Sequence, residues 1–518
     1  MKRGRVDGGI SKEDYEASEN ATANGAVALN GGFDRASNEV LRTRKLAVAA
    51  SPAGPLSDAL RRHRAALNAA FVRNLEAQRT HRNLDGDWSV NMREYLWYAR
   101  EISQTWDAGR RGKALTFGSG DCGQLGHGVE EDDDLMVKFP RPVALLEKLS
   151  IARVSCGGLH SAAVTRDGAV YTWGCNDDGA LGRSGEENLP APVEGFGRDA
   201  PHKALVVVGG DSHTAVVTTE GRVFTWGGYK DKEGKLWCDS AAPKSSFKQK
   251  QSKPFLVEAL RNIVELRCGS SFNVARASNG HVYSWGLGEM GQLARDVPGD
   301  LKKKDSDEYD VDMVYRRHLQ PARVTLGSAE LPAVRAIGCG AYHTLLVLGA
   351  TGDLYTTGLN NYGQLGVGHT DNCTELQLVD DLVGQNVVRV EGGTHHSVVL
   401  TADGSVYAFG RADSGQLGML DDCQTGDFKD RPQRVTFPDK SARIAMISSG
   451  SNHTLALSED NKVFSWGYGD MLALGHGDEQ DETRPRRLDW SKAAFAADAT
   501  ILQVDAGGQH SAIIATTD

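Results

Sequence analysis

CGGLHSAAVTRDGAVYTWGCNDDGALG, residues 156–182, predicts a β-hairpin followed by a glycine-rich loop. Ser161–Val164 and Val170–Trp173 are the two short strands, and Asp167-Gly168 between them is a pair that accepts the positive φ of a tight turn. Alone this would be one weak hairpin. It decides the fold because both of its halves recur along the chain.

The aromatic-glycine half of the hairpin occurs seven times, and successive copies begin 52 to 72 residues apart. They begin at Phe117, Trp173, Trp226, Trp285, Thr357, Phe409 and Trp466. The preceding strand also occurs seven times. Six of its copies begin with a histidine, namely His160, His213, His343, His396, His453 and His510. A regular period of short strands and glycine turns indicates a β-propeller or a solenoid.

The two ends of the repeat region favour a closed ring. Ala114–Gly118 is an aromatic-glycine strand with no histidine strand before it, and Gly507–Ala515 is a histidine strand with no aromatic-glycine strand after it. Joining the two in one blade leaves no open sheet edge, which proteins avoid. We therefore predict an all-β fold: a seven-bladed β-propeller over residues 113–518, closed by a blade shared between N- and C-terminal strands.

The repeat signatures G-x-x-H-[ST] and [FW]-G-x-x-x-x-G-Q-L-G resemble those of the regulator of chromosome condensation family of propellers, over about Lys113 to Asp518. Three stretches that do not follow the common repeat extend the likeness. GDSHTAVVTTEGRVFTWGGYKDKEG at Gly210, GLNNYGQLG at Gly358 and GGTHHSVVL at Gly392 are similar to the family's exchange factors for the GTPase Ran.

Charge is divided unevenly along the chain. Residues 1–112 hold 18 basic and 14 acidic side chains (+4), whereas residues 113–518 hold 40 basic and 54 acidic ones (−14). An acidic ring is repelled by nucleic acid, so affinity for chromatin would reside in local basic patches or in the N-terminal segment. The eight cysteines form no CxxC pair, and no signal peptide or apolar membrane span is visible. We expect a reducing compartment and no membrane partner.

Residues 1–55 are polar and rich in glycine and alanine, which predicts a disordered tail. The tail contains a short basic cluster of Lys2, Arg3 and Arg5. This cluster is either a solvated terminus or an element for nuclear import or DNA contact.

Residues 56–112 show two helical patterns of apolar residues, which predict a helical extension before the ring. The first pattern also carries several arginines, among them Arg61, Arg62 and Arg64. Such a helix either lies on phosphate or presents an ordinary solvated basic face.

Two insertions interrupt the repeat. The third copy lacks the GQLG loop and carries the lysine-rich stretch Tyr229–Lys253, and the fourth is lengthened by Arg295–His318. Long loops on a rigid ring are either plain surface loops or binding elements. We expect residues shared by the repeats to serve the fold and departures from the repeat to serve function.

No catalytic or metal-binding pattern stands out. The chain contains no GxSxG, HExxH or GxxxxGK[ST] motif. The six repeat histidines come from different blades and cannot converge on one metal ion, so we expect them to hold loop backbone by hydrogen bonds. We expect no cofactor, no metal and no catalytic residues for covalent chemistry.

The resemblance implies a set of GTPase-contacting residues on one face of the ring. A wedge from the third repeat would press into the nucleotide site of the GTPase. In this chain it corresponds to Tyr229, Lys230, Asp231, Lys232, Glu233 and Gly234. Further contact positions correspond to Asp121, His160, Asp211, Arg295, His396 and His510. Where the family has an acidic residue followed by a histidine, this chain has Ser271 and Phe272, which implies a weakened contact at Ser271.

The sequence and the resemblance together predict a nuclear guanine-nucleotide exchange factor for a Ran-type small GTPase, associated with chromatin through histones, DNA or both. Exchange of this kind forms no covalent bond. A partner that prefers the nucleotide-free GTPase weakens nucleotide binding by the same differential free energy. The main alternative is a propeller scaffold that binds chromatin or another protein without exchange. A propeller hydrolase is disfavoured because no nucleophile–base pair stands out.

Overall fold

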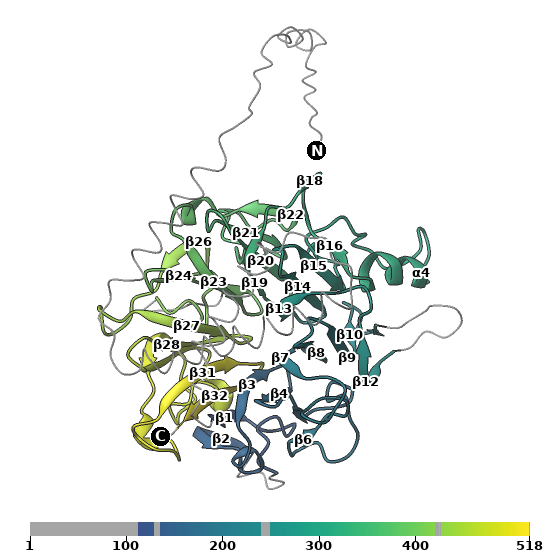
Figure 1. The fold of residues 1–518 in the computed structure, drawn as a ribbon. Helices are drawn as coiled ribbons and strands as arrows, with labels where there is room; N and C mark the ends of the chain where they lie inside the picture. Colours follow the sequence, from purple (N-terminus) through teal and green to yellow (C-terminus); the bar gives the residue numbers. More distant parts are fainter. Residues whose placement is uncertain (1–111, 129–134, 240–248, 420–423, 425, 517–518) are drawn as a thin grey trace, which may run out of the picture. The chain divides into compact units, whose positions relative to one another are not determined.

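The computed structural model describes residues 112–128, 135–239, 249–419, 424 and 426–516. The predicted tail and all of the helical extension except Gly112 lie outside these residues. The basic residues Lys2, Arg3, Arg5, Arg61, Arg62 and Arg64 therefore lie outside them as well. Within the described residues, seven four-stranded antiparallel sheets surround a common centre (Figure 1), which confirms the predicted all-β, seven-bladed propeller.

Each blade uses its four strands in the same way. The innermost strands are β3 (Ile151–Cys156), β7 (Ala204–Gly209), β13 (Ile263–Cys268), β19 (Val334–Cys339), β23 (Val387–Gly392), β27 (Ile444–Ser449) and β31 (Thr500–Ala506). The second strands are β4 (His160–Thr165), β8 (His213–Thr218), β14 (Phe272–Ala277), β20 (His343–Leu348), β24 (His396–Thr401), β28 (His453–Ser458) and β32 (His510–Thr516). The third strands are β5 (Val170–Gly174), β9 (Val223–Gly227), β15 (Val282–Gly286), β21 (Leu354–Gly358), β25 (Val406–Arg411), β29 (Val463–Gly467) and β1 (Gly112–Ser119). The outermost strands are β6 (Ala191–Pro192), β12 (Gln251–Leu256), β16 (Ala322–Arg323), β22 (Cys373–Leu378), β26 (Phe428–Arg434), β30 (Glu482–Arg487) and β2 (Met136–Pro142).

One sheet combines strands from both ends of the described chain, in the order β2-β1-β32-β31. β1 pairs antiparallel with β32 from Gly112 opposite Thr516 to Gly118 opposite His510. Around the centre, seven backbone hydrogen bonds of 2.9–3.3 Å link the loop of each blade to the next blade. One of them runs from Gly508 N–H to Gly157 O, which ties this sheet to the blade of β3.

Two glycines of the stretch 156–182 show why the same motif recurs in the blades of this chain. Gly168 has φ +85° in the turn between β4 and β5, as the Asp-Gly pair predicted. Gly182, at the end of the next loop, lies beneath the indole of the following blade, where a Cβ atom would be 2.7 Å from Trp226 Nε1. The same packing of loop glycine on aromatic ring recurs at Gly126, Gly366, Gly418 and Gly475, so the motif couples each blade to its neighbour.

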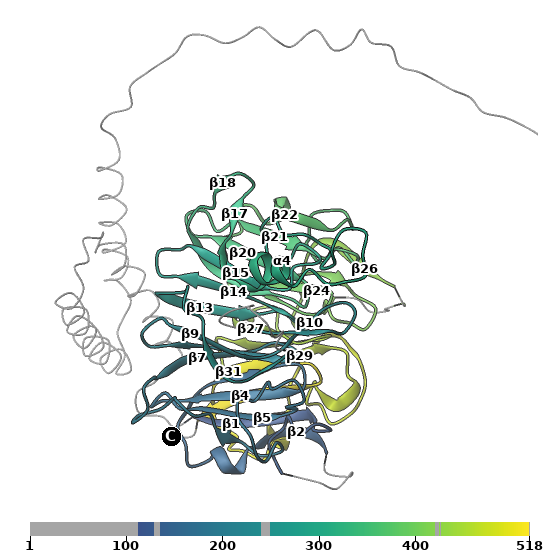
Figure 2. The same cartoon turned by 90° about the vertical axis from the view of Figure 1, so that its right-hand side faces the viewer.

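The antiparallel order also decides which loops share a face. Loops between first and second strands, and between third and fourth strands, leave each sheet at the same end (Figure 2). We call this end of the ring the loop face. It carries every GTPase-contact position that the sequence predicts.

No helix within the described ranges is long and apolar enough to cross a membrane.

Candidate functional site

The insertion of the third repeat forms a small hairpin on the loop face. β10 (Tyr229–Lys230) pairs with β11 (Leu236–Trp237), and we call residues 229–237 the wedge. Asp231 organises its turn, because Oδ1 accepts hydrogen bonds from the N–H groups of Glu233 and Lys235 at 3.0 and 2.9 Å. Its Oδ2 accepts from Trp237 Nε1 at 2.9 Å. Asp231 is buried, so it shapes the wedge from within.

The base of the wedge is anchored by a buried tyrosine. The hydroxyl of Tyr229 donates to Asp239 Oδ2 at 2.9 Å and accepts from Asn273 Nδ2 at 2.8 Å. Its ring packs edge-on against His213 with centroids 4.8 Å apart. Burial raises the pKa of Asp239 to about 6. Tyr229 is 2% exposed, so its side chain fixes the wedge to the ring.

Ser271 holds the wedge backbone. Its hydroxyl accepts from Lys230 N–H at 3.0 Å and donates to Lys230 C=O at 2.8 Å, and its side chain is buried. The structure thus gives Ser271 a role inside this chain, in contact with the wedge; the expected weakened GTPase contact at this position stays a prediction. The adjacent Phe272 fills the site of a repeat histidine, with its ring against Gly269.

The exposed charges of the wedge have partners on both neighbouring blades. Lys230 Nζ lies 2.8 Å from Asp178 Oδ2 of the preceding blade, and this hydrogen bond raises the pKa of Lys230. Lys232 Nζ lies 3.7 Å from Glu289 of the following blade. The side chains of Lys230 and Lys232 both remain 51% exposed. The two lysines of the wedge are therefore exposed to a partner, but nearby carboxylates of this chain balance part of their positive charge.

A funnel opens at the centre of the loop face beside the wedge. Its volume is about 180 Å³, and its wall is formed by the loops that follow the innermost strands. Asp211 is exposed at its rim. Although solvent reaches this carboxylate, the crowded loops displace enough water to raise its pKa, against the hydrogen bond from Ser270 and the charge of Lys230. Tyr342, 37% exposed, lies in the same wall.

Acidic side chains recur at one position of the third-to-fourth-strand loops. They are Asp121, Asp177, Glu289, Asp413 and Asp470. Asp121 and Asp177 are exposed. Of these five positions the family resemblance implied a contact only at Asp121. Aligning the repeats of this chain with one another finds all five. Together they make this loop position predominantly negative.

The repeat histidines are buried between blades. His160 Nε2 bonds Thr214 Oγ1, and His510 Nε2 bonds Ser161 Oγ, both at 2.8 Å. Because each hydroxyl donates its single proton to a loop carbonyl, Nε2 must be the donor to the hydroxyl. At these two positions the histidine reaches the loop carbonyl through a hydroxyl, whereas His213 Nε2 bonds Asn273 Oδ1 at 3.1 Å. Burial lowers the pKa of His160 to about 4, and that of His510 and His396 to about 3.

Arg295 clamps the base of the fourth-repeat insertion. Its Nη2 donates to the carbonyls of His318 and Gln320 at 3.0 and 3.2 Å, and burial lowers its pKa to about 10. The structure divides the predicted contact residues into two groups by their exposure. Exposed on the loop face are Asp121, Asp211, Lys230, Lys232, Glu233 and Gly234. Buried or engaged within the chain are Tyr229, Asp231, Ser271, Arg295, His160, His396 and His510.

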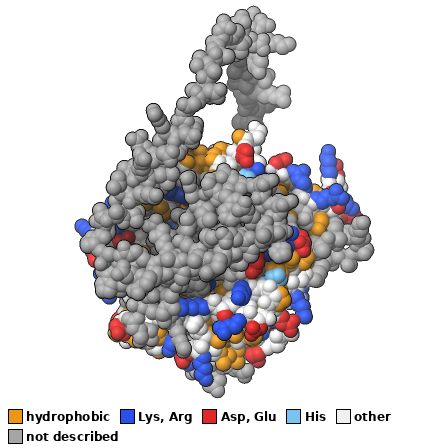
Figure 3. Space-filling view, viewed as in Figure 1, with side chains coloured by type: hydrophobic (Ala, Val, Ile, Leu, Met, Phe, Trp, Pro, Cys, Tyr) orange, Lys and Arg blue, Asp and Glu red, His pale blue; other side chains and the backbone are white. Residues whose placement is uncertain are grey.

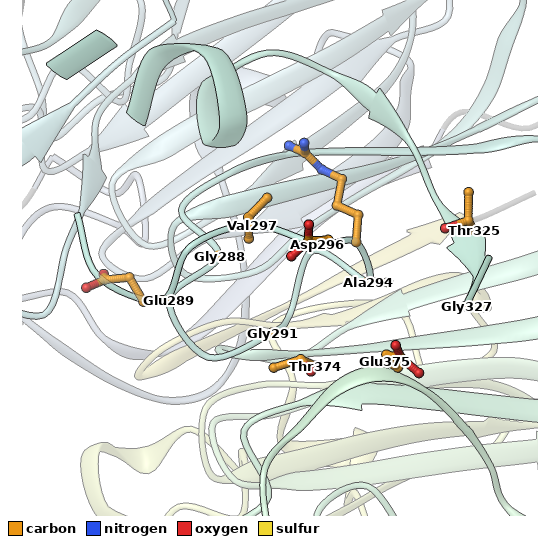
Figure 4. Close-up of a pocket in the computed structure, with 12 residues that line it drawn as sticks. Gly288, Glu289, Gly291, Ala294, Asp296, Val297, Thr325, Gly327, Thr374 and Glu375 are labelled. Carbon is orange, nitrogen blue, oxygen red and sulfur yellow. The ribbon is translucent and has the colours of Figure 1, made fainter. Parts of the chain in front are cut away.

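A second hollow of about 280 Å³ lies between the loop Gly288–Gly299 and the segments around Thr325 and Thr374 (Figure 4). No wedge residue lines it, and Glu289 points away from its other labelled residues. In the part of the chain that the structure describes, no group of three His, Cys, Asp or Glu side chains is placed to hold a metal ion. No wedge residue lines the funnel either. We take the wedge, with the funnel on the same face, as the candidate site because the wedge is an exposed departure from the repeat on the loop face.

Comparisons with known proteins show which family this chain resembles. Residues 113–513 match the model of the RCC1-like domain family. The chain is 33% identical over 411 residues to the regulator of chromosome condensation of Xenopus laevis, covering 78% of this chain and 89% of that protein. It is 32% identical to the ultraviolet-B receptor UVR8 of Arabidopsis thaliana, covering 76% and 79%. The solved structure of Saccharomyces cerevisiae Prp20p, described with its binding to Gsp1p and histones, gives a TM-score of 0.68 at 25% identity, covering 81% of this chain and 94% of Prp20p.

Proposed function

Because this chain belongs to the RCC1-like domain family, we propose that it is a guanine-nucleotide exchange factor for a Ran-type small GTPase. The observation that carries the proposal is the wedge. This hairpin, anchored by Tyr229 and Ser271, exposes Lys232, Glu233 and Gly234 on the loop face.

The wedge would act on the phosphate site of the GTPase. Such a site holds its nucleotide with backbone N–H groups, a lysine and Mg²⁺. A rigid hairpin that enters this site stabilises the nucleotide-free form and so weakens nucleotide binding by the same free energy. Acids such as Asp121 and Asp211 would pair with basic side chains of the GTPase, and the net charge of −14 over residues 113–518 would speed their encounter. No bond is made or broken in this chain.

The proposal includes a nuclear location and binding to chromatin. Support comes from the +4 charge of residues 1–112 and from the similarity to Prp20p, which was studied for its binding to histones. The histone or DNA contact would then be separate from the wedge.

A propeller scaffold without exchange activity is the second candidate. It is favoured by the similarity to UVR8, since a chain 32% identical is named as a light receptor. The two candidates differ in one measurement. An exchange factor releases labelled GDP from a Ran-type GTPase, whereas a scaffold binds a partner without release.

The decisive experiment measures GDP release with the wild-type protein and with Lys232→Gly plus Glu233→Gly. This variant alters the tip and leaves the anchors Tyr229 and Asp231 in place. The matched control is Thr219→Gly plus Glu220→Gly, in the exposed turn at the opposite end of the same blade. We expect release by wild type and control and near-complete loss in the tip variant. No release by a folded wild-type protein overturns the proposal.

A further inference from the structure

The insertion of the fourth repeat packs directly against the wedge of the third. It contains the short helix α4 (Val311–Met313) and the π-helical turn η3 (Val314–Leu319), which lie at the edge of the ring near β10 (Figures 1 and 2). Tyr229 and Trp237 of the wedge form one buried apolar cluster with residues of the following blade. These residues are Leu287, Leu301, Val314 and Leu319.

The tip of the wedge is held by two polar residues of the same insertion. Glu233 Oε1 lies 2.7 Å from Lys302 Nζ, and Glu233 Oε2 accepts a hydrogen bond from the Tyr309 hydroxyl at 2.8 Å. Lys235 Nζ lies 3.6 Å from the centroid of the Tyr309 ring and 4.6 Å from that of Trp237. An isolated surface ion pair is worth little, but both carboxylate oxygens are bound here and a cation lies between two rings.

The insertion is itself fixed to its blade. Arg295 binds the carbonyls of His318 and Gln320, and His318 Nδ1 accepts from Gly288 N–H at 3.1 Å. Asp310 caps the first turn of α4 through a hydrogen bond from Met313 N–H at 3.0 Å. Basic and acidic side chains stand side by side at this edge of the ring (Figure 3), in keeping with the internal pairing. Because the insertion is held in place by these bonds, it can in turn hold the wedge.

We propose that residues 301–319 are a brace that holds the wedge in its partner-binding position, with Lys302 and Tyr309 as positioning residues. An isolated two-stranded hairpin is marginally stable at best in water. Tyr229 and Ser271 hold the base of this one, and Lys302 and Tyr309 add contacts at Glu233 in its tip. The brace orders the tip before the partner arrives, so association does not bear that entropy cost. This inference rests on the proposed function for its effect on exchange, but the ordering of the wedge is a property of the chain alone.

The test uses the full chain and three single variants: Tyr309→Phe, Lys302→Met and, as control, Lys304→Met in the same lysine run. Hydrogen exchange is measured at the amides of residues 232–235. Loss of a bond to a charged group predicts about tenfold faster exchange there in the first two variants and no change in the control. Reversing the pair with Glu233→Lys plus Lys302→Glu restores the ion pair but not the acceptor of the Tyr309 hydroxyl, so we expect more protection than in Lys302→Met and less than in wild type. A general loss of stability would give no recovery. Equal melting temperatures would show that the ring is intact.

The same variants are then assayed for GDP release. We expect a lower kcat, by about threefold to tenfold, with an unchanged KM for the GTPase, because the rim contacts remain. Unchanged amide exchange in both brace variants overturns the brace. If the wild-type protein releases no nucleotide, the proposed function fails, and the hydrogen-exchange result still decides whether the brace exists.

Discussion

The hydroxyl of Ser271 makes two hydrogen bonds to a single residue of the wedge: it accepts from Lys230 N–H at 3.0 Å and donates to Lys230 C=O at 2.8 Å. An ionised carboxylate has no proton to donate. An aspartate at this position would keep the first bond and face the carbonyl oxygen with a negative charge. The serine therefore suits this wedge better than the acidic residue expected from the family resemblance.

The first prediction concerns Ser271→Ala and Ser271→Asp. The alanine variant leaves the Lys230 backbone groups without their partner, at a cost of about 1–3 kcal/mol to the local structure. We expect both variants to show faster amide exchange in the wedge and slower GDP release than wild type, with nearly unchanged global melting. Faster release by Ser271→Asp would contradict this view and would mean that an acid here acts on the partner.

The second prediction concerns stability at acid pH. Each repeat histidine is buried and neutral, with a pKa lowered from 6.5 to about 3 or 4 by loss of hydration. Between about pH 6.5 and 4 the unfolded chain binds protons that the folded chain does not. The free energy of unfolding should therefore fall with decreasing pH, by up to about 1.4 kcal/mol per pH unit for each histidine. Burial raises the pKa of Asp239 to about 6 and that of Asp505 to about 7, and these two carboxyl groups act in the opposite direction and offset part of the fall.

Phe272 provides the control for this prediction, because it shows that a phenyl ring fits a histidine position. His343→Phe should lose its bond to Ser397 and be less stable at pH 7.5. Its unfolding free energy should also depend less on pH, by the contribution of one group. Urea unfolding between pH 4.5 and 7.5 measures both quantities. An identical pH dependence in the variant would show that the pKa of this histidine is the same in the folded and unfolded chain.

The ring could be predicted from sequence because each blade is built from the same short sequence motifs. The Asp-Gly turn, the histidine position and the aromatic-glycine strand are local signals repeated seven times, and their unequal ends indicate which strands must share a sheet. In the structure Gly112–Ser119 pairs with His510–Thr516.

The candidate site was predicted less well, because its roles depend on contacts between insertions. Tyr229 and Asp231 lie within the predicted wedge, but both side chains are used inside this chain. Tyr229 bonds Asp239 and Asn273, and Asp231 bonds the backbone of the wedge turn. Nothing in the spacing connects Glu233 with Tyr309, 76 residues away. A family resemblance marks where a surface lies and does not separate the side chains that touch a partner from those that support them.

The third prediction tests the shared blade. Deleting residues 501–518 removes β32, which pairs with β1, and nearly all of β31, so one edge of β1 loses its partner and β3 loses strands that pack against it. We expect aggregation or loss of a single cooperative melting transition. Calorimetry and light scattering provide the measurement. A soluble truncated protein that melts at the full-length temperature would exclude closure by this blade.

The fourth prediction concerns DNA. Removing residues 1–82 should weaken binding to duplex DNA and reduce its salt dependence, because counterion release scales with the number of phosphates neutralised. Binding is measured as a function of salt by fluorescence anisotropy, with Lys304→Met as a control for basic residues on the ring. An unchanged salt slope would assign the contact to the loops of the ring.

The last prediction starts from an exception to the packing of loop glycines on aromatic rings. Ala294 has φ +54° at the position where five other loops have glycine. In those blades an aromatic ring of the following blade covers the glycine, whereas the following blade here has Thr357 in place of the aromatic residue. We expect the small Thr357 to leave room for the methyl group of Ala294, so that the two departures compensate each other.

Two substitutions and their combination test this coupling. Ala294→Gly relieves a left-handed backbone position and should stabilise the protein by up to about 1 kcal/mol. Thr357→Phe overpacks the site and removes the Thr357 hydrogen bond to Cys373 C=O, with an expected cost of about 1–3 kcal/mol. In the double variant the ring can lie over glycine as it does at Gly366 and Phe409, so part of that cost should be recovered. Urea unfolding of the four proteins gives the coupling energy. Strictly additive effects would show that Ala294 and Thr357 are independent.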